Sequence, residues 1–268
     1  MSRRALGLFL AAPVEPGRHT FQSLPRRVYN CISRPEGTAI SFEQSEIRAV
    51  AWKVVEKAAR NVGRESFWWA KILESLARYD LPRAARVAAD GLIGEGIVQQ
   101  EDAGKLLVQF AENDPGAAME ALGTAVMDEK GGWHFFVGRY DFIKRLPTRT
   151  VINWIDAHGV EAARRIARQL PSPYLSPDGT PIVPPLTLHV LKKFGEDKRV
   201  FREFVAGVHN LQMYMGDIAS QHEHEGEIAT KFLDYPLPQI QEWARLEILD
   251  AEAQANFWRD WEAERSIE

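Results

Sequence analysis

Apolar residues recur at the same three positions in five helical segments spread along this chain. Each segment begins at a short turn, at Pro82, Pro115, Val160, Lys198 or Pro238. Apolar residues follow two, six and ten positions after each turn start, a spacing that places them on one face of a helix. These fifteen positions are Ala84, Ala88, Leu92, Ala117, Ala121, Ala125, Ala162, Ile166, Leu170, Val200, Phe204, Val208, Ile240, Ala244 and Ile248. The segments recur at intervals of roughly 33 to 45 residues, which is typical of stacked helix pairs.

Each segment is predicted to be the second helix of a pair. The five pairs are expected at residues 65–94, 99–130, 148–170, 186–210 and 225–248. A two-helix unit has an apolar face that it cannot cover alone, so neighbouring units bury it and form one elongated core. The pattern therefore predicts an all-α fold, a right-handed α-solenoid of about five HEAT-like helix pairs that occupies residues 41–268.

Local signals agree with these boundaries. Asp80 and Asp114 stand where helix N-caps are needed. Pro82 and Pro115 follow in the first turn, where the missing amide costs nothing. A capping-box spacing at residues 41–44 predicts a further helix before the first pair.

Other signals mark where helices stop. Gly159 and Gly195 are expected just past helix ends, which is the usual place for glycine. The segment at 131–146 interrupts the repeat and predicts an extra short helix or an aromatic plug. A second interruption at 171–185 contains Asp178–Gly179, a turn signal typical of a small hairpin or a protruding loop.

The last helix extends beyond its repeat. Residues 239–265 are predicted to form one long helix with an acidic end that carries Phe257, Trp258 and Trp261. A solenoid must end in a cap with one polar face, and this helix is the candidate. The alternative is that it pairs with a second copy of the chain.

Residues 1–40 differ from the rest, because they are rich in Arg and Pro and lack helical periodicity. They are predicted to be a non-helical arm or the end of an upstream domain. Their short apolar run, residues 5–12, is interpreted as a buried segment rather than a signal peptide or a membrane span. Together with a single cysteine, Cys31, this indicates a cytoplasmic protein.

Charge limits the function classes. The chain has 268 residues, with 33 Lys and Arg against 37 Asp and Glu, and a net charge of −4. A dedicated binder of nucleic acid or of an anionic membrane gains its affinity from excess Lys and Arg, so this balance argues against both.

The proline-led second helices and the repeat length resemble HEAT-type or armadillo-like helical repeats. Residues 65–89 and 209–249 are also similar to the carboxy-terminal helical repeats of large bacterial multidomain proteins. The second stretch carries His209-Asn210-Leu211, Tyr214, Gly216-Asp217 and Glu242-Trp243-Ala244. The resemblance covers residues 41–268 and implies a scaffold, or a sensing or binding module attached to an effector. It brings no catalytic residues to this chain.

One cluster predicts a binding surface. Consecutive second helices line one surface of a solenoid, and two of them carry Arg164, Arg168, Arg199 and Arg202. A basic stripe of this kind is typical of a site for phosphates or an acidic partner. The alternative is an ordinary solvated face in which these arginines pair with Glu161, Glu196, Asp197 and Glu203.

A second cluster indicates metal chemistry. His222 and His224, with Glu225 and Glu227, offer zinc ligands. However, residues two apart point in different directions on a helix, and the HExxH spacing is absent. The alternative is a solvated polar turn at a helix start, where the two glutamates meet the helix dipole.

Aromatic residues gather in two further places, at residues 67–69 and at 133–136. They are predicted to pack in the core, with exposed recognition aromatics as the alternative.

The sequence predicts a protein that is not an enzyme. It has no phosphate-binding GxxxxGK[ST] loop, no GxGxxG after a strand and no GxSxG elbow. The expected function is a protein-binding scaffold or sensor module of a bacterial assembly, with a protein partner, no cofactor and no indicated small-molecule substrate. Two alternatives stay open: a nucleic-acid-binding solenoid with a basic concave surface, and a metal-dependent enzyme at His222 and His224.

Overall fold

The computed structural model describes residues 45–59, 66–93, 97–128, 136–137, 140–208 and 217–265. Within these ranges most residues lie in α-helices, and the remaining regular elements are two short hairpins and one 3-10 turn. The prediction of an all-α fold is confirmed. The chain divides into two compact units, Met1–Thr150 and Val151–Glu268, and each is described by itself. The predicted arm at residues 1–40 and the capping box at 41–44 lie outside the described residues.

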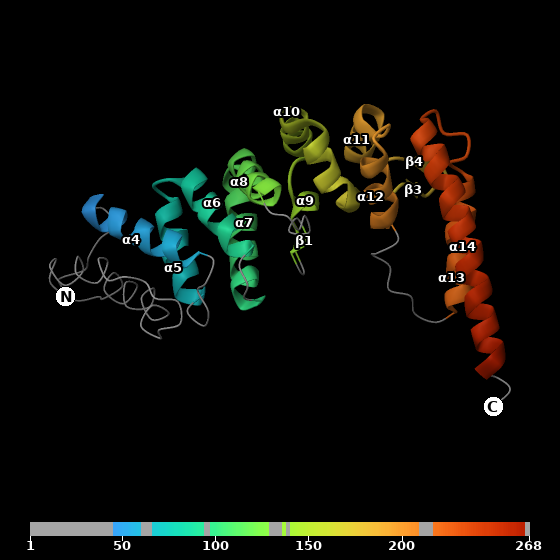
Figure 1. The fold of residues 1–268 in the computed structure, drawn as a ribbon, viewed down its shortest axis with the longest axis horizontal. Helices are drawn as coiled ribbons and strands as arrows, with labels where there is room; N and C mark the ends of the chain where they lie inside the picture. The colour runs from blue at the N-terminus through green and yellow to red at the C-terminus, as the bar shows by residue number, and fades with distance from the viewer. Residues whose placement is uncertain are drawn as a thin grey trace. The chain divides into compact units, whose positions relative to one another are not determined.

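In the first unit, each helix from α4 to α8 packs against the next (Figure 1). Its elements are α4 (Ser45–Ala58), α5 (Ser66–Ala77), α6 (Leu81–Leu92), α7 (Ile97–Asn113), α8 (Pro115–Asp128), β1 (Phe136–Val137), β2 (Tyr140–Asp141) and α9 (Phe142–Arg145). The first two predicted pairs are therefore present as α5–α6 and α7–α8. Helices α6 and α7 both contact α5 and α8 as well as each other, which places them together in the middle of this unit.

Trp69 occupies the core of the first unit. Its side chain is fully buried, and its indole Nε1 donates a hydrogen bond of 2.9 Å to the carbonyl of Val55, which joins α5 to α4. A Cβ at Gly91 would lie 2.6 Å from Trp69 Cη2, so glycine allows α6 to approach the indole. The core interpretation is confirmed for Trp69, but Phe67 is 53% exposed and does not share it. Trp133 and Phe135 lie outside the described residues.

Both predicted N-caps are confirmed. Asp80 Oδ1 accepts a hydrogen bond of 3.0 Å from the amide of Arg83, at the start of α6. Asp114 Oδ1 accepts one of 2.9 Å from the amide of Ala117, at the start of α8. Each carboxylate satisfies an amide that the first helical turn leaves without a partner.

The second unit contains the remaining predicted helices (Figure 1). Its elements are α10 (Thr148–Ile166), which begins at the end of the first unit, η2 (Ala167–Gln169), β3 (Tyr174–Leu175), β4 (Pro181–Ile182), α11 (Pro185–Phe194), α12 (Lys198–Val208), α13 (Ile218–Thr230) and α14 (Pro238–Arg265). Helix α12 packs on η2, and α14 packs on both α11 and α13.

Two glycines end helices where the sequence predicts it, for different reasons. Gly159 divides α10 into two segments, with φ 71° and ψ −150°, a conformation that is essentially restricted to glycine. Gly195 follows α11 with an ordinary φ of −69°. A Cβ at Gly195 would collide with the backbone carbonyl of Leu191 and would also lie 2.8 Å from Gln239 Cγ, so here glycine is required by close packing at the end of α11.

The repeated apolar positions form the core of the second helices. Twelve of the fifteen are buried, and the other three, Ala117, Ala125 and Ile248, are half-buried. The common register is therefore a packing register, because the same face of each second helix is removed from water.

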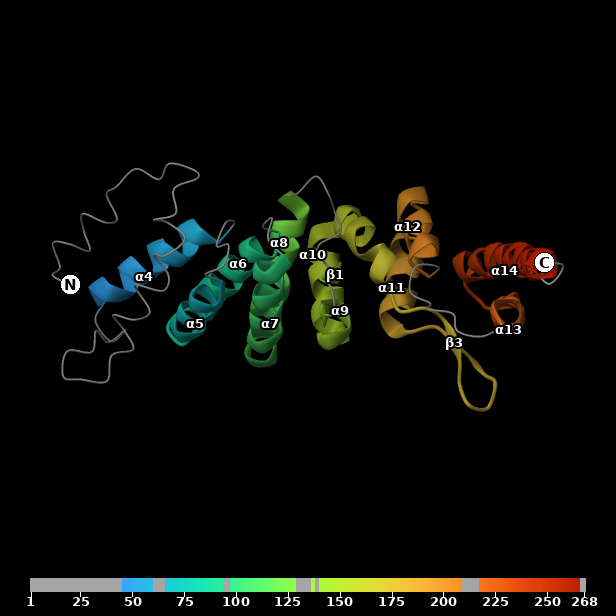
Figure 2. The same cartoon turned by 90° about the horizontal axis from the view of Figure 1, so that it is seen from below.

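Both interruptions of the repeat contain short elements. Residues 131–146 include the predicted extra helix, α9, preceded by the antiparallel β1–β2 pair, which the sequence did not predict. Residues 171–185 hold the predicted hairpin, in which Tyr174 pairs with Ile182. Its turn is closed by a hydrogen bond of 2.8 Å from the Gly179 amide to the Ser176 carbonyl. This hairpin projects from the helices of its unit (Figure 2).

The last helix pair is predicted correctly at one end only. The long helix expected at 239–265 is α14, Pro238–Arg265. Its partner α13 begins at Ile218 rather than at 225, because the side chain of Asp217 caps it by accepting a hydrogen bond of 2.9 Å from the Ser220 amide. None of the helices in the described part of the chain has the length and apolar character needed to cross a bilayer.

Gly207 sets the distance between α12 and η2. It is buried near the end of α12, and a Cβ there would collide with the backbone carbonyl of Arg168 and lie 2.8 Å from the Arg168 Cα. Backbone atoms cannot rotate away as a flexible side chain can, so any larger residue must separate the two elements.

We predict that Gly207→Ala lowers the free energy of unfolding by about 2–3 kcal/mol, since it overpacks a backbone contact. Urea unfolding followed by circular dichroism measures the change. Gly116→Ala in α8 is the matched control: its new Cβ meets only Asp114 Oδ1 at 3.4 Å, so the variant is expected to be as stable as the parent or more stable. Equal stability of Gly207→Ala and the parent chain would contradict the packing account.

Candidate interaction surfaces

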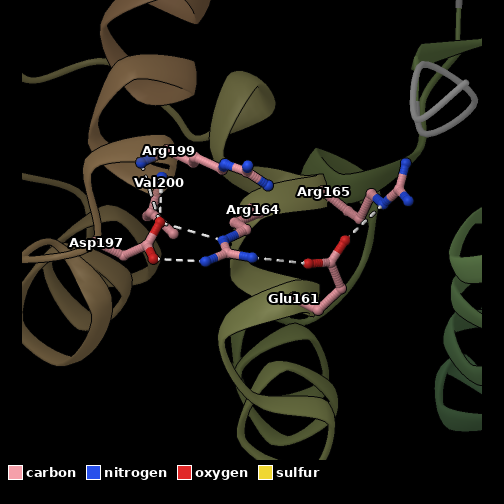
Figure 3. A network of polar contacts seen from close by, with 6 residues as sticks. All are labelled: Glu161, Arg164, Arg165, Asp197, Arg199 and Val200. Carbon is pink, nitrogen blue, oxygen red and sulfur yellow. Dashed lines mark hydrogen bonds and ion pairs between the residues drawn. The ribbon is translucent and has the colours of Figure 1, made fainter.

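Arg164 joins the second segment of α10 to the start of α12 (Figure 3). Its Nη2 lies 2.7 Å from Asp197 Oδ2 and its Nε lies 3.2 Å from Asp197 Oδ1, so the guanidinium donates two bonds to one carboxylate. Its Nη1 also donates to Glu161 Oε2 at 3.1 Å. Asp197 Oδ1 accepts further bonds from the amides of Arg199 and Val200, at 3.0 and 3.1 Å. One carboxylate therefore serves as both the ion-pair partner of α10 and the N-cap of α12.

These contacts keep Asp197 ionised. The hydrogen bonds from Arg164, and next the amide of Val200, hold the pKa of the Asp197 carboxyl well below its usual range. Both side chains of the pair are about a quarter exposed, so water screens their attraction. The pair fixes the placement of α12 against α10 more than it adds to overall stability.

The other three predicted binding arginines lie in different surroundings. Arg168 Nη1 lies 3.9 Å from Glu203 Oε2, and Glu203 Oε1 lies 3.5 Å from Arg202 Nη2. The side chain of Arg202 is nevertheless 73% exposed. Arg199 is exposed, and among the described residues its guanidinium forms no ion pair with a carboxylate. Three of the four arginines, Arg164, Arg168 and Arg202, thus lie within 4 Å of a carboxylate, while Arg199 and Arg202 are the two whose side chains are exposed on α12.

A second polar link joins the first segment of α10 to α11. Asp156 Oδ1 accepts bonds from Lys193 Nζ at 2.7 Å and from His189 Nε2 at 2.9 Å. The bond from Lys193, followed by that from His189, lowers the pKa of the Asp156 carboxyl. Lys193 and His189 of α11 are therefore both held by one carboxylate of α10.

The structure does not bring His222 and His224 together. Both lie inside α13, so the expectation of a polar turn at a helix start is wrong. His222 is buried, with Nδ1 3.0 Å from Glu225 Oε2, whereas the side chain of His224 is 71% exposed and lies 3.5 Å from Glu227 Oε2. Within the described ranges, no group of three or more His, Cys, Asp or Glu side chains is arranged to hold a metal ion.

The exposed face of α14 carries large apolar side chains that the sequence analysis only partly identified. We call Leu246, Leu249, Ala253, Phe257 and Trp261 the outer face of α14. All five are exposed, and Leu249 and Phe257 are 64% and 58% exposed. The expectation that this helix caps a solenoid with a polar face stays a prediction. The sequence analysis identifies Phe257 and Trp261 by their residue type. It does not identify Leu246 and Leu249, although the helical spacing of these two leucines continues the same stripe.

Comparison with protein-family models, with curated proteins and with solved structures finds no match to this chain. The relationship to HEAT or armadillo repeats accordingly stays a prediction from the sequence pattern.

We predict that the Arg164–Asp197 pair couples α10 to α12 in a pH-dependent manner. A double-mutant cycle with Arg164→Met and Asp197→Asn isolates the pair, because asparagine retains the helix cap. Since the pKa of Asp197 is lower in the folded chain than its ordinary value of 3.8, the stabilisation is complete above that value and is lost as the pH falls below it.

Urea unfolding at pH 7 and at about pH 2.5 measures the coupling free energy, which is expected to be favourable at pH 7 and smaller in acid. Arg202→Met, on the exposed side of α12, is the control and is expected to leave the stability unchanged at both pH values. Coupling that is absent, or that does not change with pH, would show that the pair has no such role.

Proposed function

We propose that this chain is a non-catalytic, cytoplasmic protein-binding module, a scaffold or sensor of a bacterial assembly, built as a right-handed α-solenoid of HEAT-like helix pairs. The solenoid is supported by the shared packing register of the second helices and by the way α5 to α8 pack in sequence within the first unit. Such arrays present long surfaces formed by equivalent helices, which suit protein partners better than small substrates.

The outer face of α14 is the observation that carries the binding function. Large apolar side chains are normally withdrawn from water, and a contiguous exposed group of them typically marks a surface that a partner covers. Phe257 and Trp261 are the residue types that dominate binding energy in protein interfaces. The nucleic-acid alternative has weaker support, because Arg164 and Arg168 contact carboxylates and leave Arg199 and Arg202 as the exposed arginines of the predicted stripe.

Affinity capture tests the proposal. The full chain, tagged at one end and expressed in its source cells, is treated with a reversible crosslinker and purified. We predict that one protein is recovered in near-stoichiometric amount, well above its level with an unrelated tagged helical protein. Repeated preparations in which no protein exceeds the control level would contradict a protein-binding function.

A further inference from the structure

The outer face of α14 is a straight apolar strip on a single helix. Its residues Leu246, Leu249, Ala253, Phe257 and Trp261 follow one another at intervals of three or four, so they project within about 120° of the helix circumference. From Leu246 to Trp261 the strip is about 22 Å long. The rings of Phe257 and Trp258 meet edge to face at 5.5 Å, and those of Trp258 and Trp261 at 5.3 Å, which gives the distal half a rigid aromatic surface.

This strip is separate from the face by which α14 joins its own unit. The buried residues of α14 are Ile240, Trp243, Ala244, Glu247, Ala251 and Ala255. Ala251 packs closely on α13, since a Cβ at Gly226 would lie 3.3 Å from the Ala251 Cβ. Arg259 forms an ion pair with Glu223 of α13, which fixes the same side of the helix pair, and α13 lies beside α14 in both ribbon views (Figures 1 and 2). Helix α14 therefore has two apolar faces, one used internally and one exposed.

Carboxylates outnumber arginines along the outer face. At about 100° per residue, the polar side chains that share the sector with the strip are those of Glu242, Asp250, Asp260 and Glu264. All four of these residues are exposed. Two arginines reach this sector: Arg245 forms an ion pair of 3.2 Å with Glu242, and the guanidinium of Arg265 lies over the Trp261 ring, 4.2 Å from its centre. The outer face is thus an apolar strip bordered by carboxylates.

The shape of the strip favours a helical partner. A helix surface offers no unpaired backbone N–H or C=O groups, so an extended segment lying on it would leave its own backbone unsatisfied. A helix satisfies its backbone internally and presents apolar residues at intervals of three and four that match the strip. A partner helix of about 15 residues covers the strip from Leu246 to Trp261.

The carboxylates select the charge of that partner. Two copies of the outer face would place the excess carboxylates of one chain against those of the other, and such like-charge contacts are costly. An anionic membrane is disfavoured for the same reason, because helices that lie on such membranes carry Lys and Arg beside the apolar face. A helix with an apolar stripe flanked by Lys and Arg complements the outer face, because its stripe matches the apolar strip and its cations match the carboxylates.

We propose that the outer face of α14 is a docking site for a basic amphipathic helix of a partner protein. The proposal rests on the protein-binding function and names the chemical class of the partner. The apolar strip supplies affinity through Phe257 and Trp261, and the four carboxylates supply orientation and selectivity against acidic segments.

Two labelled synthetic peptides of about 18 residues test the proposal. They share one leucine stripe with helical spacing and differ in their flanking residues, which are Lys and Arg in one and Glu in the other. Fluorescence anisotropy with the full chain is expected to give at least tenfold tighter binding of the basic peptide, weakening as NaCl rises from about 50 to 300 mM.

Matched variants assign the binding to the strip. Phe257→Ser with Trp261→Ser is expected to weaken the basic peptide at least tenfold, and Asp260→Asn with Glu264→Gln several-fold. Tyr174→Ser removes an exposed aromatic residue from the β3–β4 hairpin and is expected to leave binding unchanged. All substituted side chains are exposed, so the variants are expected to fold, which circular dichroism checks.

Three results would overturn the proposal: equal affinity for the two peptides, no binding of either, or binding that the Phe257 and Trp261 substitutions do not change. Sedimentation that finds a dimer abolished by the same substitutions would assign the strip to a second copy, and retention on anionic vesicles would assign it to a membrane. If affinity capture recovers a protein partner while the peptides fail, the protein-binding function stands and the assigned class of partner is wrong.

Discussion

The burial of one narrow apolar stripe on each second helix is the constraint on which this structure depends. The stripe consists largely of small residues in the first unit, such as Ala84, Ala88 and Ala121, and of larger ones in the second, such as Ile166, Phe204 and Ile240. Fully burying a large aliphatic or aromatic side chain contributes about 1.5–3 kcal/mol, whereas an exposed ion pair contributes at most about 1 kcal/mol. Packing therefore holds the helices together, and polar contacts such as Asp156 with Lys193 set how neighbouring helices are aligned.

Close approach at a few glycines makes this packing specific. Gly91 admits the Trp69 indole, and Gly207 admits the backbone of Arg168. Neither position requires a special backbone conformation, so their role is spatial. Gly159 has a different role. No atom lies within 4 Å of the position that its Cβ would take, so glycine is required there by the backbone conformation alone. The same residue type thus defines the distance between elements in one place and ends a helix in another.

Much of the helical framework could be predicted from the sequence, because its determinants are local. Asp80 and Asp114 cap the helices that follow them, and the apolar period of each second helix lies within a dozen residues. The start of α13 was missed although Asp217 caps it locally, because the residues that follow, from Gln221 to Glu227, are polar or glycine and show no apolar period. Contacts between distant residues, such as Arg164 with Asp197 or Gly207 with Arg168, leave no periodic signal in the sequence.

The candidate surfaces likewise combine features that local sequence signals reveal with features that only the fold reveals. The helical repeat indicated Arg164 and Arg168 as binding residues, and the alternative, that they pair with carboxylates such as Asp197 and Glu203, is what the structure shows for these two. The outer face of α14 could have been found from the sequence by extending the helical spacing from Phe257 back to Leu246. It was assigned to a cap because the acidic residues around it suggest a solvated end. In the proposed docking site those carboxylates border the apolar strip, where they would oppose self-association and favour a basic partner.

Small-angle X-ray scattering of the purified full chain tests the proposed continuous helical array most directly. A compact chain of 268 residues has a radius of gyration of about 18 Å. A solenoid predicts a clearly larger radius together with a normalised Kratky curve that peaks and returns to the baseline, as for one rigid, elongated particle. A radius near 18 Å, or a Kratky curve that rises to a plateau as for flexibly joined units, would contradict it.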